Sequence, residues 1–209
     1  MGCPPGKDSY LLVEGINDQR VIQALCAQHQ VPETFEVCFP GNGGIEAVLE
    51  AIPLYLKMSG LQTFGVVIDA DVDIQACWNR VRDRLQKAQY DVPKQPIQEG
   101  FIALLPNRPR IGIWLMPDNQ LPGMLEDFVG YLIPQKDRLK PVAEKTLQSI
   151  EKKSLNLYRP SYRSKAFIHT WLAWQETPGM PMQAITAQVL QHNQPLASHF
   201  VDWLKNLFV

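Results

Sequence analysis

Acidic side chains occur where three expected strands end. Glu14 follows the first apolar run, Asp69, Asp71 and Asp73 follow the third, and Asp118 follows the last. In open α/β sheets, ligands bind outside the carboxyl ends of the strands. We therefore expect these carboxylates to lie near one another at a single edge of the sheet.

Carboxylate oxygens at one sheet edge are typical of a site for Mg²⁺ or Mn²⁺, which keep water ligands that a phosphate can displace. Asp69 and Asp71 are separated by one residue, so both can face the same ion. We predict that Asp69 and Asp71 bind the metal with help from Asp73 and Asp118, and that Glu14 acts as a base or as a ligand. Acids at strand ends also serve as helix N-caps, and Asp73 could be only a cap.

The residues that would position these acids alternate between strand and helix patterns. Strand-like runs occupy residues 10–13, 35–39, 61–68, 101–105 and 111–116, and the first three are each followed by a helical pattern. Alternation of this kind predicts an α/β fold with a mostly parallel sheet flanked by helices. The last two runs are joined by a proline-rich turn and could pair as a hairpin.

From residue 122 onward every segment predicts helix: 122–133, 137–153, 162–174, 181–192 and 196–208. We therefore divide the chain into an α/β domain, residues 1–130, and an all-helical C-terminal extension, residues 131–209, packed on it. The last helix has an apolar face formed by Trp203, Leu204, Leu207 and Phe208. Docking of this face onto the rest of the chain is favoured over a homodimer contact, which stays open.

The composition excludes several classes of protein. The chain has 209 residues, 45% hydrophobic and 20% charged, which excludes a largely disordered polymer. It has no apolar run long enough for a membrane span and no secretory signal pattern, so we expect a cytoplasmic protein without membrane contact. The four cysteines lack the clustered spacing of a zinc site, and Cys26 and Cys77 are predicted to be buried free thiols.

Charge is distributed unevenly. Residues 1–130 carry 10 Lys+Arg and 16 Asp+Glu, a net −6, whereas residues 131–209 carry 10 and 5, a net +5. The basic residues include Lys152, Lys153, Arg159, Arg163 and Lys165, and tyrosines interleave with the arginines. Positive charge follows phosphates and aromatic rings stack on bases, which indicates a nucleic-acid contact. An ordinary solvated helix face is the alternative, and the pI near 6.4 argues against strong nonspecific binding.

Two short motifs suggest a family. Leu-Leu-Val-Glu14-Gly15-Ile-Asn-Asp18, followed by a strand ending in Asp69-Ala-Asp71, resembles the Toprim domain in its primase and nuclease branch. With the stretches Trp114-Leu-Met-Pro-Asp-Asn and Trp171-Leu-Ala-Trp-Gln-Glu-Thr-Pro-Gly, nearly the whole chain resembles an uncharacterised bacterial Toprim-like family.

The resemblance implies a four-stranded, largely parallel sheet, with Glu14 as general acid/base or metal ligand and Asp69 and Asp71 as the Mg²⁺-binding pair. One feature departs from the family pattern. Many members have a glycine in Asp-x-Asp-x-x-Gly, whereas this chain has no glycine after Asp71 until Gly100.

Three functions compete at this stage. The first is a Mg²⁺-dependent phosphodiester-processing enzyme, a nuclease, in which Glu14, Asp69 and Asp71 converge. The second is a catalytically degenerate Toprim-like module that binds nucleic acid, a nucleotide or a protein partner. The third, ranked last, is a phosphatase of the haloacid-dehalogenase type with Asp69 as nucleophile and Asp71 as acid, and a position of Glu14 remote from Asp69 would favour it.

Overall fold

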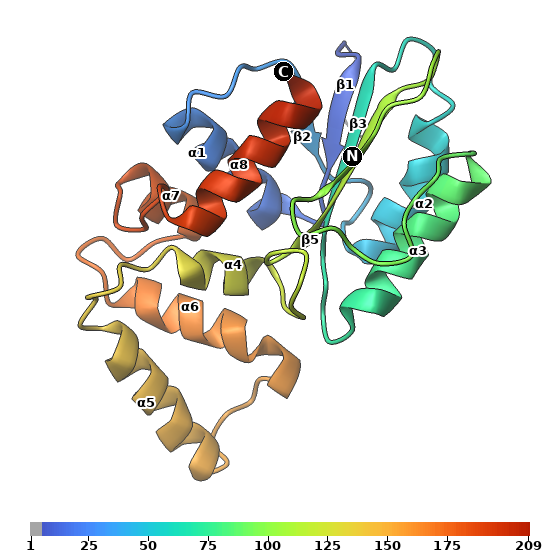
Figure 1. Cartoon of the computed structure of the whole chain (residues 1–209). Coiled ribbons are helices and arrows are strands. Elements are labelled where there is room, and N and C mark those ends of the chain that lie inside the picture. The colour runs from blue at the N-terminus through green and yellow to red at the C-terminus, as the bar shows by residue number, and fades with distance from the viewer. Residues whose placement is uncertain (1–5) are drawn as a thin grey trace.

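In the computed structural model, which describes residues 6–209, a five-stranded sheet separates two layers of helices (Figure 1). The strand order is β2-β1-β3-β5-β4, and every neighbouring pair is parallel except β4 with β5. The elements are β1 (Ser9–Leu12), α1 (Ile16–Gln28), β2 (Glu36–Cys38), α2 (Ile45–Tyr55), β3 (Thr63–Asp69), α3 (Ile74–Lys87), β4 (Phe101–Ala103), β5 (Arg110–Met116), α4 (Leu125–Tyr131), α5 (Lys140–Lys152), a 3₁₀ turn (Pro160–Tyr162), α6 (Arg163–Ala173), α7 (Pro181–Thr186) and α8 (Pro195–Phe208).

The predicted α/β class with a mostly parallel, helix-flanked sheet is confirmed. The five strand-like runs all form strands, and β4 and β5 pair as an antiparallel hairpin, one of the arrangements that the sequence allows. The sheet thus has five strands, four of them parallel, rather than the four implied by the family resemblance. The central strands β1, β3 and β5 are covered on both faces, which explains their continuous apolar sequences.

One face of the sheet packs against α2 and α3. Side chains that alternate along the strands, including Leu12, Val66 and Ile113, form a buried cluster with apolar residues of these two helices. Helix α3 begins as expected after Asp73, whose carboxylate accepts the Ala76 backbone N–H at 2.9 Å. Helix α1 begins at Ile16, with Gly15 as its N-cap.

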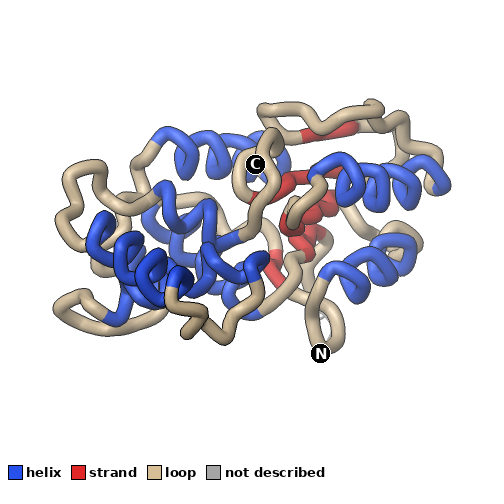
Figure 2. The backbone as a smooth tube through the Cα atoms, turned by 90° about the horizontal axis from the view of Figure 1, so that it is seen from below, coloured by secondary structure: helices blue, strands red, loops and turns tan. Residues whose placement is uncertain are grey.

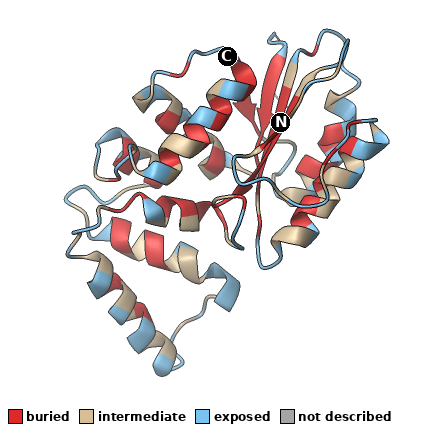
Figure 3. Ribbon diagram, viewed as in Figure 1, coloured by how far each residue is buried: buried red, intermediate tan, exposed pale blue. Residues whose placement is uncertain are grey.

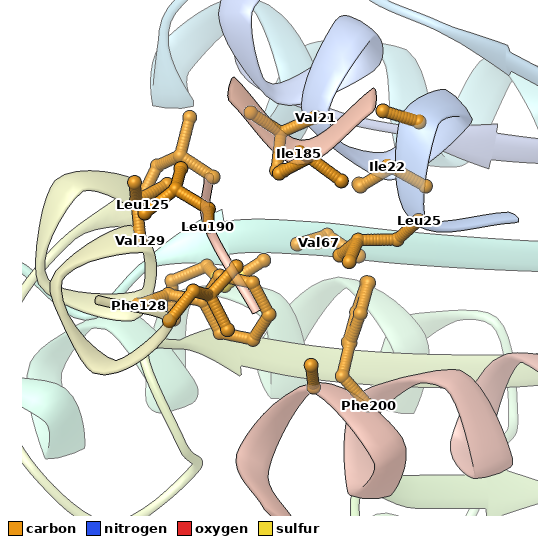
Figure 4. Packing of buried hydrophobic residues seen from close by; sticks show 14 of the residues in the cluster. Val21, Ile22, Leu25, Val67, Leu125, Phe128, Val129, Ile185, Leu190 and Phe200 are labelled. Atoms are coloured by element: carbon orange, nitrogen blue, oxygen red, sulfur yellow. The ribbon is translucent and has the colours of Figure 1, made fainter. Parts of the chain in front are cut away.

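The other face packs against α1, α4, α7 and α8. In Figure 4, Val67 of β3 lies among side chains of these four helices and of Leu190, in the loop after α7. Helix α8 lies close to the sheet because the paired residues Gly65 and Gly112 have no side chains. A Cβ atom on Gly112 would lie 2.4 Å from Leu207 Cδ2, so the sequence of these two strands determines how near α8 can pack.

All five helices expected after residue 122 are present, although the fourth ends at Thr186 rather than near residue 192. The apolar face of α8 is docked: Trp203, Leu204 and Leu207 are buried, and Phe208 stacks on Phe35. The strands lie together in one part of the molecule, and the part farthest from them consists of helices and loops (Figure 2). Buried residues line the inner sides of these helices, whereas their outer sides are exposed (Figure 3).

Two further expectations concern side chains and membranes. Cys26 and Cys77 are free thiols, as expected; Cys77 is buried and Cys26 is half-buried. None of the helices formed by residues 6–209 combines the length and the apolar character that crossing a bilayer requires.

Candidate functional site

The fold brings Glu14 and Asp69 together at the carboxyl edge of the sheet. Glu14 lies two residues after β1, and Asp69 is the last residue of the neighbouring strand β3. The Asp69 backbone N–H donates a hydrogen bond to Glu14 Oε1 at 2.8 Å. The Asp69 carboxylate in turn accepts the Leu125 N–H at 2.9 Å, which links β3 to the start of α4.

A glycine-rich loop packs directly on Glu14. The Gly44 N–H donates to the Glu14 backbone carbonyl at 2.7 Å. Gly43 has φ +84°, and a Cβ atom there would lie 2.6 Å from the same carbonyl oxygen. Only glycine permits this approach, which places the N-terminal end of α2 beside Glu14.

Two further acids, Asp18 and Glu126, join Glu14 and Asp69 in what we call the acidic cluster. Asp18 lies in the first turn of α1 and Glu126 in the first turn of α4, and their side chains are almost completely buried. Sequence reasoning did not assign either residue to the site. Both had a usable signal: Asp18 lies one helical turn after Glu14, and Glu126 lies in the first turn of the helix that follows the last strand.

The members of the acidic cluster make one another harder to ionise. Burial raises the pKa of Glu14 to about 7, with further contributions from the negative charges of Asp18 and Asp71. Burial likewise raises the pKa of Asp18 to about 6, and the charge of Glu126 adds to it. The pKa of Asp69 lies well above its ordinary value because of burial and then the charges of Asp18, Glu14 and Glu126. A cation placed among these groups would relieve this repulsion.

Lys165 of α6 is the cation that the fold supplies. Its Nζ lies 3.1 Å from Glu126 Oε1 and 5.9 Å from the centre of the Tyr162 ring. Desolvation lowers the pKa of Lys165, but attraction to Glu126, Asp69 and Asp18 outweighs this, so that the pKa is raised. One lysine therefore offsets part of the negative charge of the acidic cluster.

Asp71 is exposed and adopts φ +50°, a conformation that usually favours glycine. Two backbone hydrogen bonds join it to Gly123: Asp71 N–H to Gly123 O at 2.8 Å, and Gly123 N–H to Asp71 O at 2.7 Å. These bonds tie the loop after β3 to the loop before α4. They hold the turn in a segment that lacks the glycine of the Asp-x-Asp-x-x-Gly pattern.

The remaining predicted ligands bond to their own segments. The Asp73 carboxylate caps α3, and Asp118 Oδ1 accepts the N–H groups of Gln120 and Leu121 at 3.0 and 2.8 Å. Their roles as metal ligands stay predictions.

The predicted basic surface is divided in the structure. Arg163 bonds to Glu144 and Glu151 at 3.1 and 2.9 Å and so joins α6 to α5. Lys165 faces the acidic cluster, whereas Lys152, Lys153 and Arg159 are exposed around the end of α5.

The donor chemistry of the acidic cluster fits a hard divalent cation, because every side chain that it offers is a carboxylate. Within residues 6–209, however, no three or more His, Cys, Asp or Glu side chains are gathered closely enough to hold one metal ion. Mg²⁺ is usually held by one or two protein carboxylates with water completing its shell, so a site for this ion does not require three such side chains.

The match to a protein family covers almost the whole chain. Residues 8–209 match a family model described as "Protein of unknown function (DUF3226)". The chain belongs to the DUF3226 family. Searches of curated proteins and of solved structures found no match.

Proposed function

We propose that this DUF3226 protein has a Toprim-like fold and is a Mg²⁺- or Mn²⁺-dependent enzyme that cleaves phosphodiester bonds in nucleic acid. The observation that carries the proposal is the direct hydrogen bond between the Asp69 backbone and the Glu14 carboxylate, at adjacent strand ends. It joins the glutamate of one motif to the first aspartate of the other.

The proposed roles follow from the chemistry of each group. Asp69 and Asp71 would hold the metal, which would stabilise charge on a phosphoryl oxygen. Glu14 has a pKa raised by burial to about 7, so its carboxylate can accept and return a proton near neutral pH. Lys152, Lys153 and Arg159 are exposed and available to contact the phosphate backbone, which gives affinity without sequence preference.

A second function is favoured by a specific observation. Lys165 already places a positive charge beside Glu126, and the described residues form no group of three metal-binding side chains. Both features are what a Toprim-like module that binds nucleic acid, a nucleotide or a protein without turnover would have. The phosphatase hypothesis loses its support, because Glu14 lies in direct contact with Asp69 rather than far from it.

The test is cleavage of labelled single-stranded DNA, duplex DNA and RNA by the full chain with Mg²⁺ or Mn²⁺ and with EDTA. The Asp69→Asn/Asp71→Asn double variant removes the two proposed metal ligands. The matched control, Asp91→Asn/Asp202→Asn, removes the same number of charges from exposed positions away from the acidic cluster. Circular dichroism establishes that each variant is folded.

We expect metal-dependent cleavage by the wild type and the control, reduced to background in the Asp69/Asp71 variant. Cleavage that persists in that variant would place the active site elsewhere. If the folded wild type cleaves none of the substrates, the enzyme proposal fails and the binding module replaces it. Calorimetric titration with Mg²⁺ would then show whether the acidic cluster binds metal at all.

A further inference from the structure

A second polar site lies at the amino ends of β3 and β5, which is the end of the sheet opposite the acidic cluster. Three chain segments, residues 53–61, 84–90 and 107–109, line an open pocket of about 710 Å³. We call it the basic pocket. A neighbouring hollow of about 800 Å³ shares part of the wall of the basic pocket, at residues 60–61 and 107–109. A volume in this range accommodates a small-molecule ligand.

The charge of the basic pocket is entirely positive. Its lining includes Lys57, Arg84, Lys87 and Arg108, and none of its lining residues is acidic. None of these four cations forms an ion pair with any other residue in the part of the chain that the structure describes.

Some cations elsewhere in the described part of the chain do have carboxylate partners. Arg80 pairs with Glu46, and Arg163 bonds to two glutamates of α5. Even the cation beside the acidic cluster, Lys165, has a carboxylate partner. The basic pocket is therefore a place where the fold gathers positive charge without supplying the carboxylate that it supplies at these positions.

Backbone carbonyls hold the two guanidinium groups in fixed orientations. Arg84 donates from Nε to Leu49 O at 2.9 Å and from Nη1 to Arg80 O at 2.7 Å, which leaves its Nη2 without a partner among the described residues. Arg108 donates from Nη1 to Ala88 O, and its Cζ lies 5.9 Å from the centre of the Tyr90 ring. An oriented guanidinium loses less entropy when it binds an anion, and its planar fork matches a phosphate.

The ends of two helices account for only part of this charge. Helices α2 and α3 both end at the basic pocket, where their dipoles favour cations. Each helix end is equivalent to roughly −0.5 charge, so two ends offset about one of the four positive charges. The excess of about three positive charges remains for an external anion.

We propose that the basic pocket binds a small phosphorylated molecule of nucleotide size. Its phosphate would lie among the four cations, and its apolar part against the wall formed by Leu56, Met58 and Leu61. The basic pocket lies at the amino ends of the strands, whereas the acidic cluster lies at their carboxyl ends, and the two share no residue. The proposal therefore stands independently of the cleavage activity.

The test is calorimetric titration of the full chain with inorganic pyrophosphate, with ADP, with adenosine and with a single-stranded oligonucleotide. The Lys57→Gln/Lys87→Gln variant removes two pocket charges whose side chains are exposed and make no hydrogen bond to other described residues, so folding is preserved. The matched control, Lys94→Gln/Lys136→Gln, removes two exposed lysines outside the pocket.

We expect ADP to bind the wild type and the control equally, and the pocket variant at least about tenfold more weakly, a loss of roughly 1.4 kcal/mol. Pyrophosphate binding as tight as ADP binding would identify the phosphate alone as the recognised group and support the site. The proposal is overturned if neither phosphate compound binds at millimolar concentration, if adenosine binds as well as ADP, or if the pocket and control variants bind alike. A single-stranded oligonucleotide that binds more tightly than ADP through the same lysines would replace the small molecule by nucleic acid.

Discussion

Replacing Glu14 by glutamine is expected to stabilise the metal-free protein at alkaline pH. Burial raises the pKa of this carboxyl from 4.5 to about 7, the charges of Asp18 and Asp71 add to the rise, and the Asp69 N–H bond opposes it. Each tenfold change in an ionisation constant is worth about 1.4 kcal/mol. Ionised Glu14 therefore lowers the free energy of unfolding by about 3 kcal/mol at pH 8.

The pH dependence has a definite sign. Because the pKa of Glu14 is higher in the folded chain than in the unfolded chain, its contribution to stability is fully present below pH 4.5 and is lost as pH rises through about 7. Glutamine still offers an oxygen to the Asp69 N–H but does not ionise. The stability gained by the variant should therefore grow from near zero at about pH 4 to about 3 kcal/mol at about pH 8.

Urea denaturation in EDTA at a series of pH values measures this difference. Glu50→Gln, an exposed position on α2, is the control and should change the free energy of unfolding by no more than about 0.5 kcal/mol. The reasoning is refuted if Glu14→Gln is no more stable than the wild type at pH 8, or if the variant is equally stabilised at both ends of the pH range. Either result would show that ionisation of the buried Glu14 carboxyl does not lower the free energy of unfolding. Added Mg²⁺ should raise the melting temperature of the wild type more than that of the variant, because only the wild type has the full set of carboxylates.

Two further predictions concern packing and helix contacts. Gly112→Ala places a Cβ atom 2.4 Å from Leu207 Cδ2 and should lower the free energy of unfolding by about 1–3 kcal/mol through overpacking, measured by urea denaturation. Arg163→Ala removes the links to Glu144 and Glu151 and should cost about 1 kcal/mol, because the partners are partly exposed; hydrogen exchange should become faster in α5 and the start of α6.

Each of these predictions has an internal control. Gly130→Ala lies on α4, where a Cβ atom would meet Ile168 at an ordinary 3.8 Å, so it should stabilise the chain by roughly 0.5–1 kcal/mol through helix propensity. A loss of stability in Gly130→Ala as large as that in Gly112→Ala would contradict the packing argument. For Arg163, retention of normal exchange in α5 after substitution would show that the ion pairs do not hold the two helices together.

The sequence alone determined the class of the fold and two of the four members of the acidic cluster, Glu14 and Asp69. Alternating strand and helix patterns depend on local spacing, and parallel strands end at a common edge, so the sequence by itself predicts that Glu14 and Asp69 lie near each other. The cap at Asp73 was also readable, because capping involves only residues three apart. Both inferences needed nothing beyond short-range geometry.

The tertiary structure decided which charges meet. Glu126 and Lys165 join the cluster because α4 and α6 pack beside the carboxyl edge, a result of burying apolar helix faces that no motif encodes. The basic pocket arises in the same way, since its cations come from three segments that are separated in the chain. Burial of hydrophobic side chains is nondirectional and acts between residues far apart in the chain, which is why local sequence patterns predict the elements but not the charged groups that the elements bring together.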